Sequence, residues 1–123
     1  MLFRSTETLS NLGALSATPT SYNLNNGTTF YHSSTTLGSN WTANFTNVPT
    51  TTERTILVTI FVIQGATPYI PNAVQIDGAA QTLKWSQAAA PTGTANQTDV
   101  FTFALMRISS AWGNVLGSYN TFG

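Results

Sequence analysis

Side chains able to carry out catalysis are few and widely spaced in this sequence. His32 is the only histidine, and the four carboxylates are Glu7, Glu53, Asp77 and Asp99. A glycosidase needs two carboxylates that face each other across the substrate. Glu53 and Asp99 could meet in space, but nothing in the sequence favours that arrangement. We therefore expect no catalytic residues and no enzyme activity.

The same residues have simpler structural explanations. We expect His32 to be an ordinary surface or packed histidine, because it falls at the end of an expected strand. Asp77 precedes Gly78 in a turn, and Asp99 is expected to cap the loop before it by hydrogen bonding to the backbone. The chain has no cysteine, and no Gly-rich phosphate loop follows a strand. We therefore predict no metal site and no cofactor.

Aromatic side chains are the one feature of the sequence that suggests a ligand, namely a carbohydrate. Trp41, Trp85, Trp112, Tyr69 and Tyr119 could stack on sugar rings while the many Asn and Thr residues bind hydroxyl groups. Aromatic residues at strand positions belong more often to a core or an interface. Exposure of the three tryptophans therefore decides between the two interpretations. Burial of all three would remove the sugar anchors, whereas two in one polar-rimmed groove would support them.

Charge is unusually sparse. Charged residues make up 7% of the chain and the net charge is zero, against about 25% charged residues in typical domains. No basic stripe is present, so we expect no nucleic-acid binding. The longest apolar run is about eight residues, too short for membrane insertion. A surface with so little charge is poorly protected against association, which is typical of proteins that work inside assemblies.

The elements that position these residues are expected to be strands, organised around residues 54–64. Ile56, Val58 and Ile60 alternate there with Leu57 and Phe61, so both faces of the segment are apolar. A strand with two apolar faces is expected to be buried on both sides. Its cover would be a second sheet on one side and either another layer or a neighbouring subunit on the other.

The remaining pattern also favours strands and turns. Residues 40–47 alternate between apolar and polar positions. Residues 99–108 form another strong strand, with Phe101, Phe103 and Leu105 on one face and Val100, Thr102, Ala104, Met106 and Ile108 on the other, and residues 112–122 form a final strand or two short ones. Asn26-Gly27 and Asp77-Gly78 each predict a two-residue hairpin turn. With about seven strands and no convincing helix, we predict an all-β, antiparallel β-sandwich or jelly-roll-like domain over residues 21–123.

Residues 1–20 follow neither the two-residue period of a strand nor the 3.6-residue period of a helix. We interpret them as an extended N-terminal arm. Leu9, Leu12 and Leu15 are more apolar than a solvated tail needs to be. One hypothesis is that this arm docks on a neighbouring subunit. The alternative is a frayed terminus, the usual fate of such segments.

Residues 41–123 resemble the C-terminal β-domain of virion structural and tail-fibre proteins of tailed bacteriophages, notably cyanophages. The similarity follows a series of short motifs in a fixed order rather than one signature. These motifs are Phe45-Thr46-Asn47-Val48-Pro49, Gln64-Gly65-Ala66-Thr67, Ile70-Pro71-Asn72-Ala73-Val74-Gln75-Ile76-Asp77-Gly78, Lys84-Trp85, Ala90-Pro91-Thr92, Asn96, Asp99-Val100, Phe101, Phe103, Trp112, Leu116-Gly117 and Phe122-Gly123.

The resemblance implies a non-enzymatic virion structural protein, assembled in the host cytoplasm and present in the virion. We expect it to associate with itself, as a homotrimer, and with other capsid or tail proteins. Capsid decoration and a tail or fibre component remain open as its position. The alternative is a glycan-binding adhesin module that recognises the host cell surface. The expected assembly or glycan contacts are Leu9, Leu12, Leu15, Trp41, Tyr69, Trp85 and Trp112.

Overall fold

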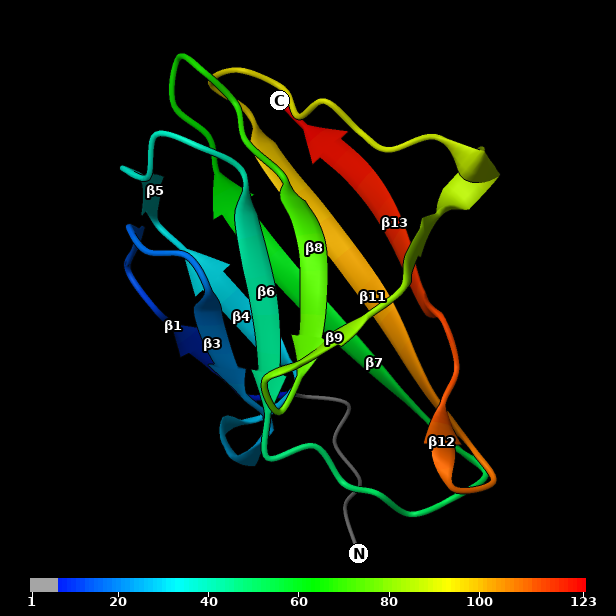
Figure 1. The fold of residues 1–123 in the computed structure, drawn as a ribbon. Helices are drawn as coiled ribbons and strands as arrows, with labels where there is room; N and C mark the ends of the chain where they lie inside the picture. Colours follow the sequence, from blue (N-terminus) through cyan, green and yellow to red (C-terminus); the bar gives the residue numbers. More distant parts are fainter. Residues whose placement is uncertain (1–6) are drawn as a thin grey trace, which may run out of the picture.

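The computed structural model describes residues 7–123, which fold into two face-to-face β-sheets and a short third sheet (Figure 1). The larger sheet contains β1 (Leu9–Asn11), β4 (Thr29–His32), β7 (Arg54–Ile63), β11 (Thr98–Ile108), β13 (Val115–Phe122) and β10 (Leu83–Trp85) in that order, and β12 (Ala111–Trp112) pairs with β11. The smaller sheet contains β3 (Thr20–Asn23), β6 (Trp41–Thr46), β8 (Pro71–Ile76) and β9 (Ala79–Gln81). The predicted all-β sandwich is confirmed.

A third sheet and two 3-10 helices complete the described chain. The third sheet pairs β2 (Ala14–Leu15) with β5 (Ser34–Thr35). Two short 3-10 helices, η1 (Leu24–Asn26) and η2 (Ser86–Ala88), lie in connections. Among residues 7–123, no helix is long and apolar enough to cross a membrane.

Strand directions are mixed rather than purely antiparallel, because the chain alternates between the two sheets. It runs from β4 in the larger sheet through β6 in the smaller one to β7, so β4 and β7 pair in parallel. In the same way β6 and β8 pair in parallel, because the chain passes through β7 in the larger sheet between them. The long strands β7, β11 and β13 are antiparallel neighbours.

One of the two predicted hairpins is wrong. The chain around Asn26-Gly27 does not fold back on itself, since β3 pairs with β6 while β4 pairs with β7. The Asn23 side chain accepts a hydrogen bond from the backbone of Asn25, and η1 carries the chain from one sheet to the other. Gly27 leaves this turn at a φ of 104°, a conformation that favours glycine.

The second predicted hairpin is confirmed. Ile76 and Ala79 are cross-strand partners, and Asp77 and Gly78 form the two-residue turn between them, both at positive φ. After this turn the chain forms two short strands, of which β9 stays in the smaller sheet and β10 joins the edge of the larger one.

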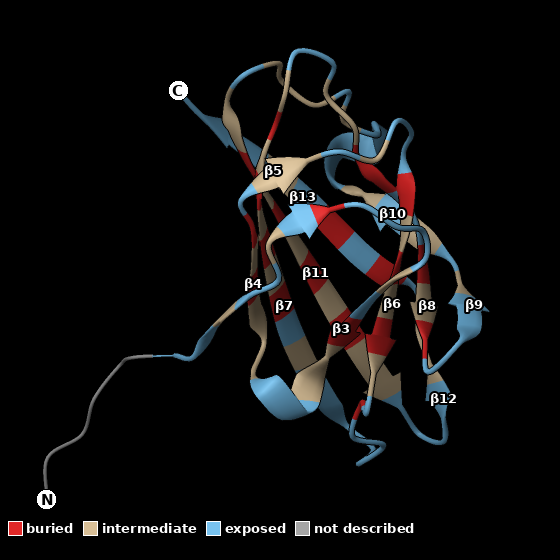
Figure 2. Cartoon of the chain, turned by 90° about the vertical axis from the view of Figure 1, so that its left-hand side faces the viewer, coloured by how far each residue is buried: buried red, intermediate tan, exposed pale blue. Residues whose placement is uncertain are grey.

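The core lies between the two sheets. Figure 2 shows buried positions alternating with less buried ones along β7, β11 and β13. This alternation is what a period of two produces when one face of a sheet is covered. The largest fully buried aromatic side chains are Tyr22, Phe30, Trp41, Phe45, Phe101 and Phe103.

The prediction that residues 54–64 are buried on both sides is wrong for a single chain. Val58, Ile60 and Val62 are fully buried against the smaller sheet. On the opposite side Leu57 is 59% exposed and Phe61 only half-buried, because the described chain has no third layer there.

The predicted N-terminal arm needs a similar correction. Leu9 and Leu12 are exposed, but β1 pairs with β4 and Leu15 is fully buried in the core. Residues 9–15 therefore belong to the folded domain rather than extending away from it. Residues 1–6 lie outside the described part of the chain, so an arm formed by them stays a prediction.

Candidate functional site

His32 is a packed histidine, one of the two possibilities expected from the sequence. Its Nδ1 faces the carbonyl oxygen of Gly13 at 3.2 Å and so carries the proton. Its Nε2 therefore accepts from the hydroxyl of Tyr22 at 2.9 Å, and that hydroxyl accepts from Nε1 of Trp41 at 3.1 Å. Burial lowers the pKa of His32 below its ordinary value of 6.5 and raises the pKa of Tyr22. The side chains of His32, Tyr22 and Trp41 therefore have their polar atoms hydrogen-bonded inside the core.

Asp99 caps its preceding loop, as predicted. Its carboxylate is fully buried and accepts hydrogen bonds from the backbone of Thr94 at 3.0 Å, from Nε2 of Gln64 at 3.0 Å and from the Tyr119 hydroxyl at 3.1 Å. It pairs with Val62 near one end of β7.

Glu53 and Asp99 do not meet. Glu53 precedes Arg54 at the opposite end of β7 from Val62, the partner of Asp99. Its carboxylate accepts a hydrogen bond from the backbone of Ser109 at 3.1 Å. The two-carboxylate arrangement considered for a glycosidase is therefore not formed by this pair. Among residues 7–123 there is also no group of three or more residues that could hold a metal ion.

The three tryptophans do not share a groove. Trp41 is 1% exposed and belongs to the core, so it cannot stack on a ligand. Trp85 is half-buried at the edge of the larger sheet, beside Tyr119. Trp112 is half-buried at the end of β11, where the guanidinium of Arg107 lies 5.1 Å from its ring centre. Tyr69, also half-buried, has its backbone held by the side chain of Gln64.

Within residues 7–123, nothing covers one side of the larger sheet, and we call this side the outer face. It is formed by the outward-pointing residues of β4, β7, β11 and β13. These are Thr29, Tyr31, Thr55, Leu57, Thr59, Phe61, Ile63, Thr98, Val100, Thr102, Ala104, Met106, Ile108, Leu116, Ser118, Asn120 and Phe122.

The outer face is apolar and neutral. Leu57, Leu116 and Phe122 are 59%, 44% and 60% exposed. The strand registers place hydroxyl side chains in one row, Thr29–Thr59–Thr102–Ser118, and aliphatic ones in the next row, Leu57–Ala104–Leu116. None of the outer-face residues just named is charged. Such a continuous, uncharged, partly apolar surface is typical of an interaction site.

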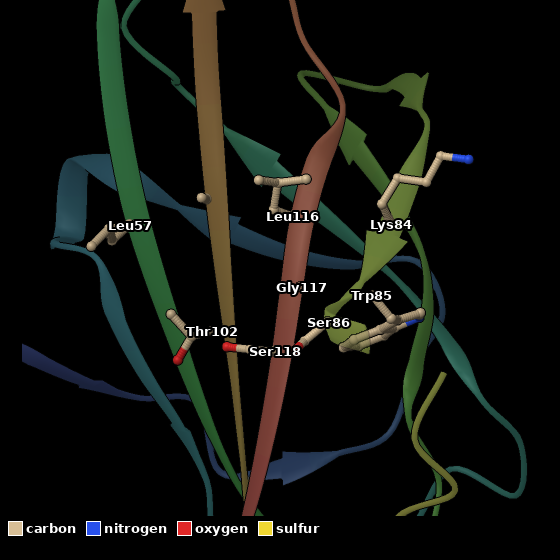
Figure 3. Close-up of a pocket in the computed structure, with 9 residues that line it drawn as sticks. Leu57, Lys84, Trp85, Ser86, Thr102, Leu116, Gly117 and Ser118 are labelled. Carbon is tan, nitrogen blue, oxygen red and sulfur yellow. The ribbon is translucent and has the colours of Figure 1, made fainter. Parts of the chain in front are cut away.

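A hollow of about 380 Å³ lies on the outer face where it approaches β10 (Figure 3). Leu57 on β7 and Leu116 on β13 flank the small side chain of Ala104, and Thr102 and Ser118 continue the lining. A surface with projecting leucines beside a hollow can interlock with a copy of itself.

Among the residues that the structure describes, charges appear only at the margins of this surface. The carboxylate of Glu7 accepts a hydrogen bond from Thr29 at 3.0 Å beside the β1 edge. Lys84 lies on β10, at the opposite edge, where it pairs in register with Leu116. The two edges of the larger sheet therefore carry opposite charges.

The chain matches no protein-family model, and searches of curated proteins and of solved structures likewise gave no match.

Sequence reasoning anticipated part of this surface and missed the rest. The double apolar alternation of residues 54–64 correctly placed Leu57 and Phe61 opposite the core residues. Leu116 and Phe122 were not among the expected contacts, because glycines interrupt the pattern of residues 112–122. Their place beside β7 depends on registers with β11 that no local pattern encodes.

Proposed function

We propose that this chain is a non-enzymatic structural protein of a tailed-bacteriophage particle that associates with copies of itself through the outer face. The single observation that carries the proposal is the exposed, uncharged row containing Leu57 and Leu116. Interfaces between permanently associated copies are large and apolar, with few charges at their centre. The outer face has this chemistry.

The outer face supplies a large part of the area that such an interface needs. At about 4.8 Å between strands and about 3.3 Å per residue, β4, β7, β11 and β13 span roughly 500 Å² before the relief of side chains is added. Stable interfaces bury about 800 Å² per partner. Covering Leu57 and Leu116, both about half exposed, contributes on the order of 2 kcal/mol.

The opposite charges at the two edges of the larger sheet favour a second copy of this chain as the partner that covers the outer face. In a closed ring, the β1 edge of one copy meets the β10 edge of the next, which brings Glu7 toward the neighbour's Lys84. Opposite charges at the rim of an apolar contact fix its register. We propose a homotrimer, a closed symmetry that repeats this contact.

A place in a phage particle is supported by the sequence resemblance of residues 41–123 to virion structural and tail-fibre domains. Capsid decoration and a tail or fibre position both fit a self-associating β-module. The test is mass spectrometry of gradient-purified phage particles, combined with immunogold labelling. We expect the chain in stoichiometric amounts, with the label on the head or on the tail deciding the position. Particles that lack the chain would refute the virion assignment.

A glycan-binding adhesin is the second candidate, favoured by one feature. Trp85 and Tyr119 line a hollow of about 380 Å³ together with the polar side chains of Ser86 and Thr92. An aromatic wall beside hydroxyl groups suits a sugar ring. Glycan-array binding that is lost in Trp85→Ala but kept in Trp112→Ala would support this function, and an array without signal would exclude it for the glycans displayed.

A further inference from the structure

The larger sheet extends beyond the smaller one at the end where β7 begins. β7 and β11 contain 10 and 11 residues, whereas β6 and β8 contain 6 each. Arg54 and Arg107 lie at this overhang as direct cross-strand partners. By strand alternation they project from the same side as the buried Leu105. Two like charges directly opposite each other are destabilising, so their pairing calls for an explanation.

The contacts of the two guanidinium groups leave hydrogen-bonding capacity unused. Arg54 donates from Nη1 to the carbonyl oxygen of Glu53 at 3.1 Å rather than to a carboxylate. The nearby carboxylate of Glu53 instead accepts from the backbone of Ser109. Within residues 7–123, Nε of Arg107 is the one buried side-chain polar atom without a hydrogen-bond partner. A buried donor of this kind is normally satisfied by water, an ion or a ligand.

A cavity of about 280 Å³ lies at the same place. Both arginines line it, with Trp112, Pro49, Ile56 and Thr51 forming part of its wall. The guanidinium of Arg107 is stacked at 5.1 Å over the ring of Trp112, which restricts its orientation. No carboxylate belongs to the lining among the described residues. The cavity is therefore positive, partly apolar and preorganised on one side.

We propose that this cavity binds an oxyanion, a carboxylate or phosphate group, between Arg54 and Arg107. Planar guanidinium groups present paired N–H donors that match the oxygen spacing of both anions. The anion accepts hydrogen bonds from the guanidinium groups that line the cavity and offsets the repulsion between the two cations. The apolar wall formed by Pro49 and Ile56 accommodates the body of a small organic acid. This site is distinct from the outer face and goes beyond the proposed structural function.

The test is a titration of the full chain with sodium acetate, sodium galacturonate and inorganic phosphate at constant ionic strength. Binding is followed by NMR at the indole N–H of Trp112 and the Nε–H of Arg107. We expect saturable shifts at these two signals. Tighter binding of galacturonate than of acetate identifies a ring-bearing carboxylate as the ligand class, whereas preferential binding of phosphate identifies a phosphate group.

Variants distinguish binding of the anion in this cavity from a general attraction of anions to positively charged side chains. Because a hydrogen bond to a charged group contributes about 1.5–3 kcal/mol, Arg107→Gln and Arg54→Gln should each weaken binding by about tenfold or more. Lys84→Gln makes the same change in charge away from this cavity, on β10, and should leave the affinity unchanged. Arg54 is exposed, so its variant tests the site even if Arg107→Gln does not fold. Equal weakening in all three variants, or no saturable shift in the wild type, would overturn the proposal.

Discussion

The hydroxyl group of Tyr22 donates a hydrogen bond of 2.9 Å to Nε2 of His32, inside the core. The opposite nitrogen of the same ring donates to the carbonyl of Gly13. Through this ring, the segment between β1 and β2 is attached to the centre of the sandwich. Both contacts require a neutral imidazole with the proton on Nδ1.

Stability should therefore depend on pH through His32. Burial lowers the pKa of His32 in the folded chain below 6.5. Above that pH the ring is neutral in both states and the full stability is present. As the pH falls below 6.5, the unfolded chain binds a proton that the folded chain resists, so stability is lost until the folded pKa is passed. Denaturant unfolding at pH 7.5 and pH 5.5 should show a loss of at most about 1.4 kcal/mol per pH unit.

The matched control for this effect is His32→Asn, which removes the titrating group. We expect this variant to be less stable at every pH but to lose the dependence between pH 7.5 and pH 5.5. A variant that keeps the wild-type slope would show that another group is responsible.

Gly117 leaves space for the ring of Trp85. A methyl group added at Gly117 would lie 2.9 Å from two ring carbons of Trp85, closer than real contacts allow. Gly117→Ala should therefore displace Trp85 and destabilise the chain by about 1–3 kcal/mol. Gly38→Ala is the control, because its added methyl group meets nothing within 4 Å. Equal thermal unfolding of the two variants would contradict the close packing of Trp85.

Asp99 holds the loop of residues 89–97 against the end of the larger sheet. In Asp99→Asn, one oxygen is replaced by an amide donor that faces other donors, from Tyr119 or from Gln64 and Thr94. We expect a loss of about 1–3 kcal/mol and faster hydrogen exchange in the loop. Tyr119→Phe removes a single bond to the same carboxylate and should have a smaller effect. Unaltered exchange in Asp99→Asn would exclude this role.

Leu15 tests the corrected position of the N-terminal segment. Since it is fully buried, Leu15→Ala should cost about 2–5 kcal/mol of the free energy of unfolding. Leu12→Ala, at a side chain that is 39% exposed, should cost much less. Similar losses in both variants, measured by denaturant unfolding, would restore the interpretation of residues 9–15 as a loosely attached arm.

The sequence predicts those features of this fold that depend on local patterns. Alternation identified β7 and β11 as strands and separated the residues of their two faces, and the place of Asp99 before a strand identified its capping role. The Asn26-Gly27 prediction failed because the same dipeptide also suits a turn that crosses between sheets. Whether the chain folds back or crosses over is decided by distant strands, here β6 and β7.

The candidate sites were harder to predict for the same reason. Leu57 meets Leu116, and Arg54 meets Arg107, only after the registers of β7, β11 and β13 are set. Those registers depend on burying Val58, Phe101 and Phe103 together against the smaller sheet. Long-range pairing of this kind leaves no spacing in the sequence from which the outer face or the arginine pair could be derived.

The central claim, that the outer face joins copies of this chain, is tested most directly by the mass of the purified protein in solution. Light scattering coupled to size-exclusion chromatography should give three times the chain mass of 13.2 kDa for the wild type. The double variant Leu57→Asn, Leu116→Asn should give a folded single chain, because both side chains are solvent-exposed in the isolated fold. Ala80→Asn changes an exposed residue of β9, in the smaller sheet, and should keep the wild-type mass. A wild type that stays at the single-chain mass at every concentration, or a double variant that still assembles, would contradict the account.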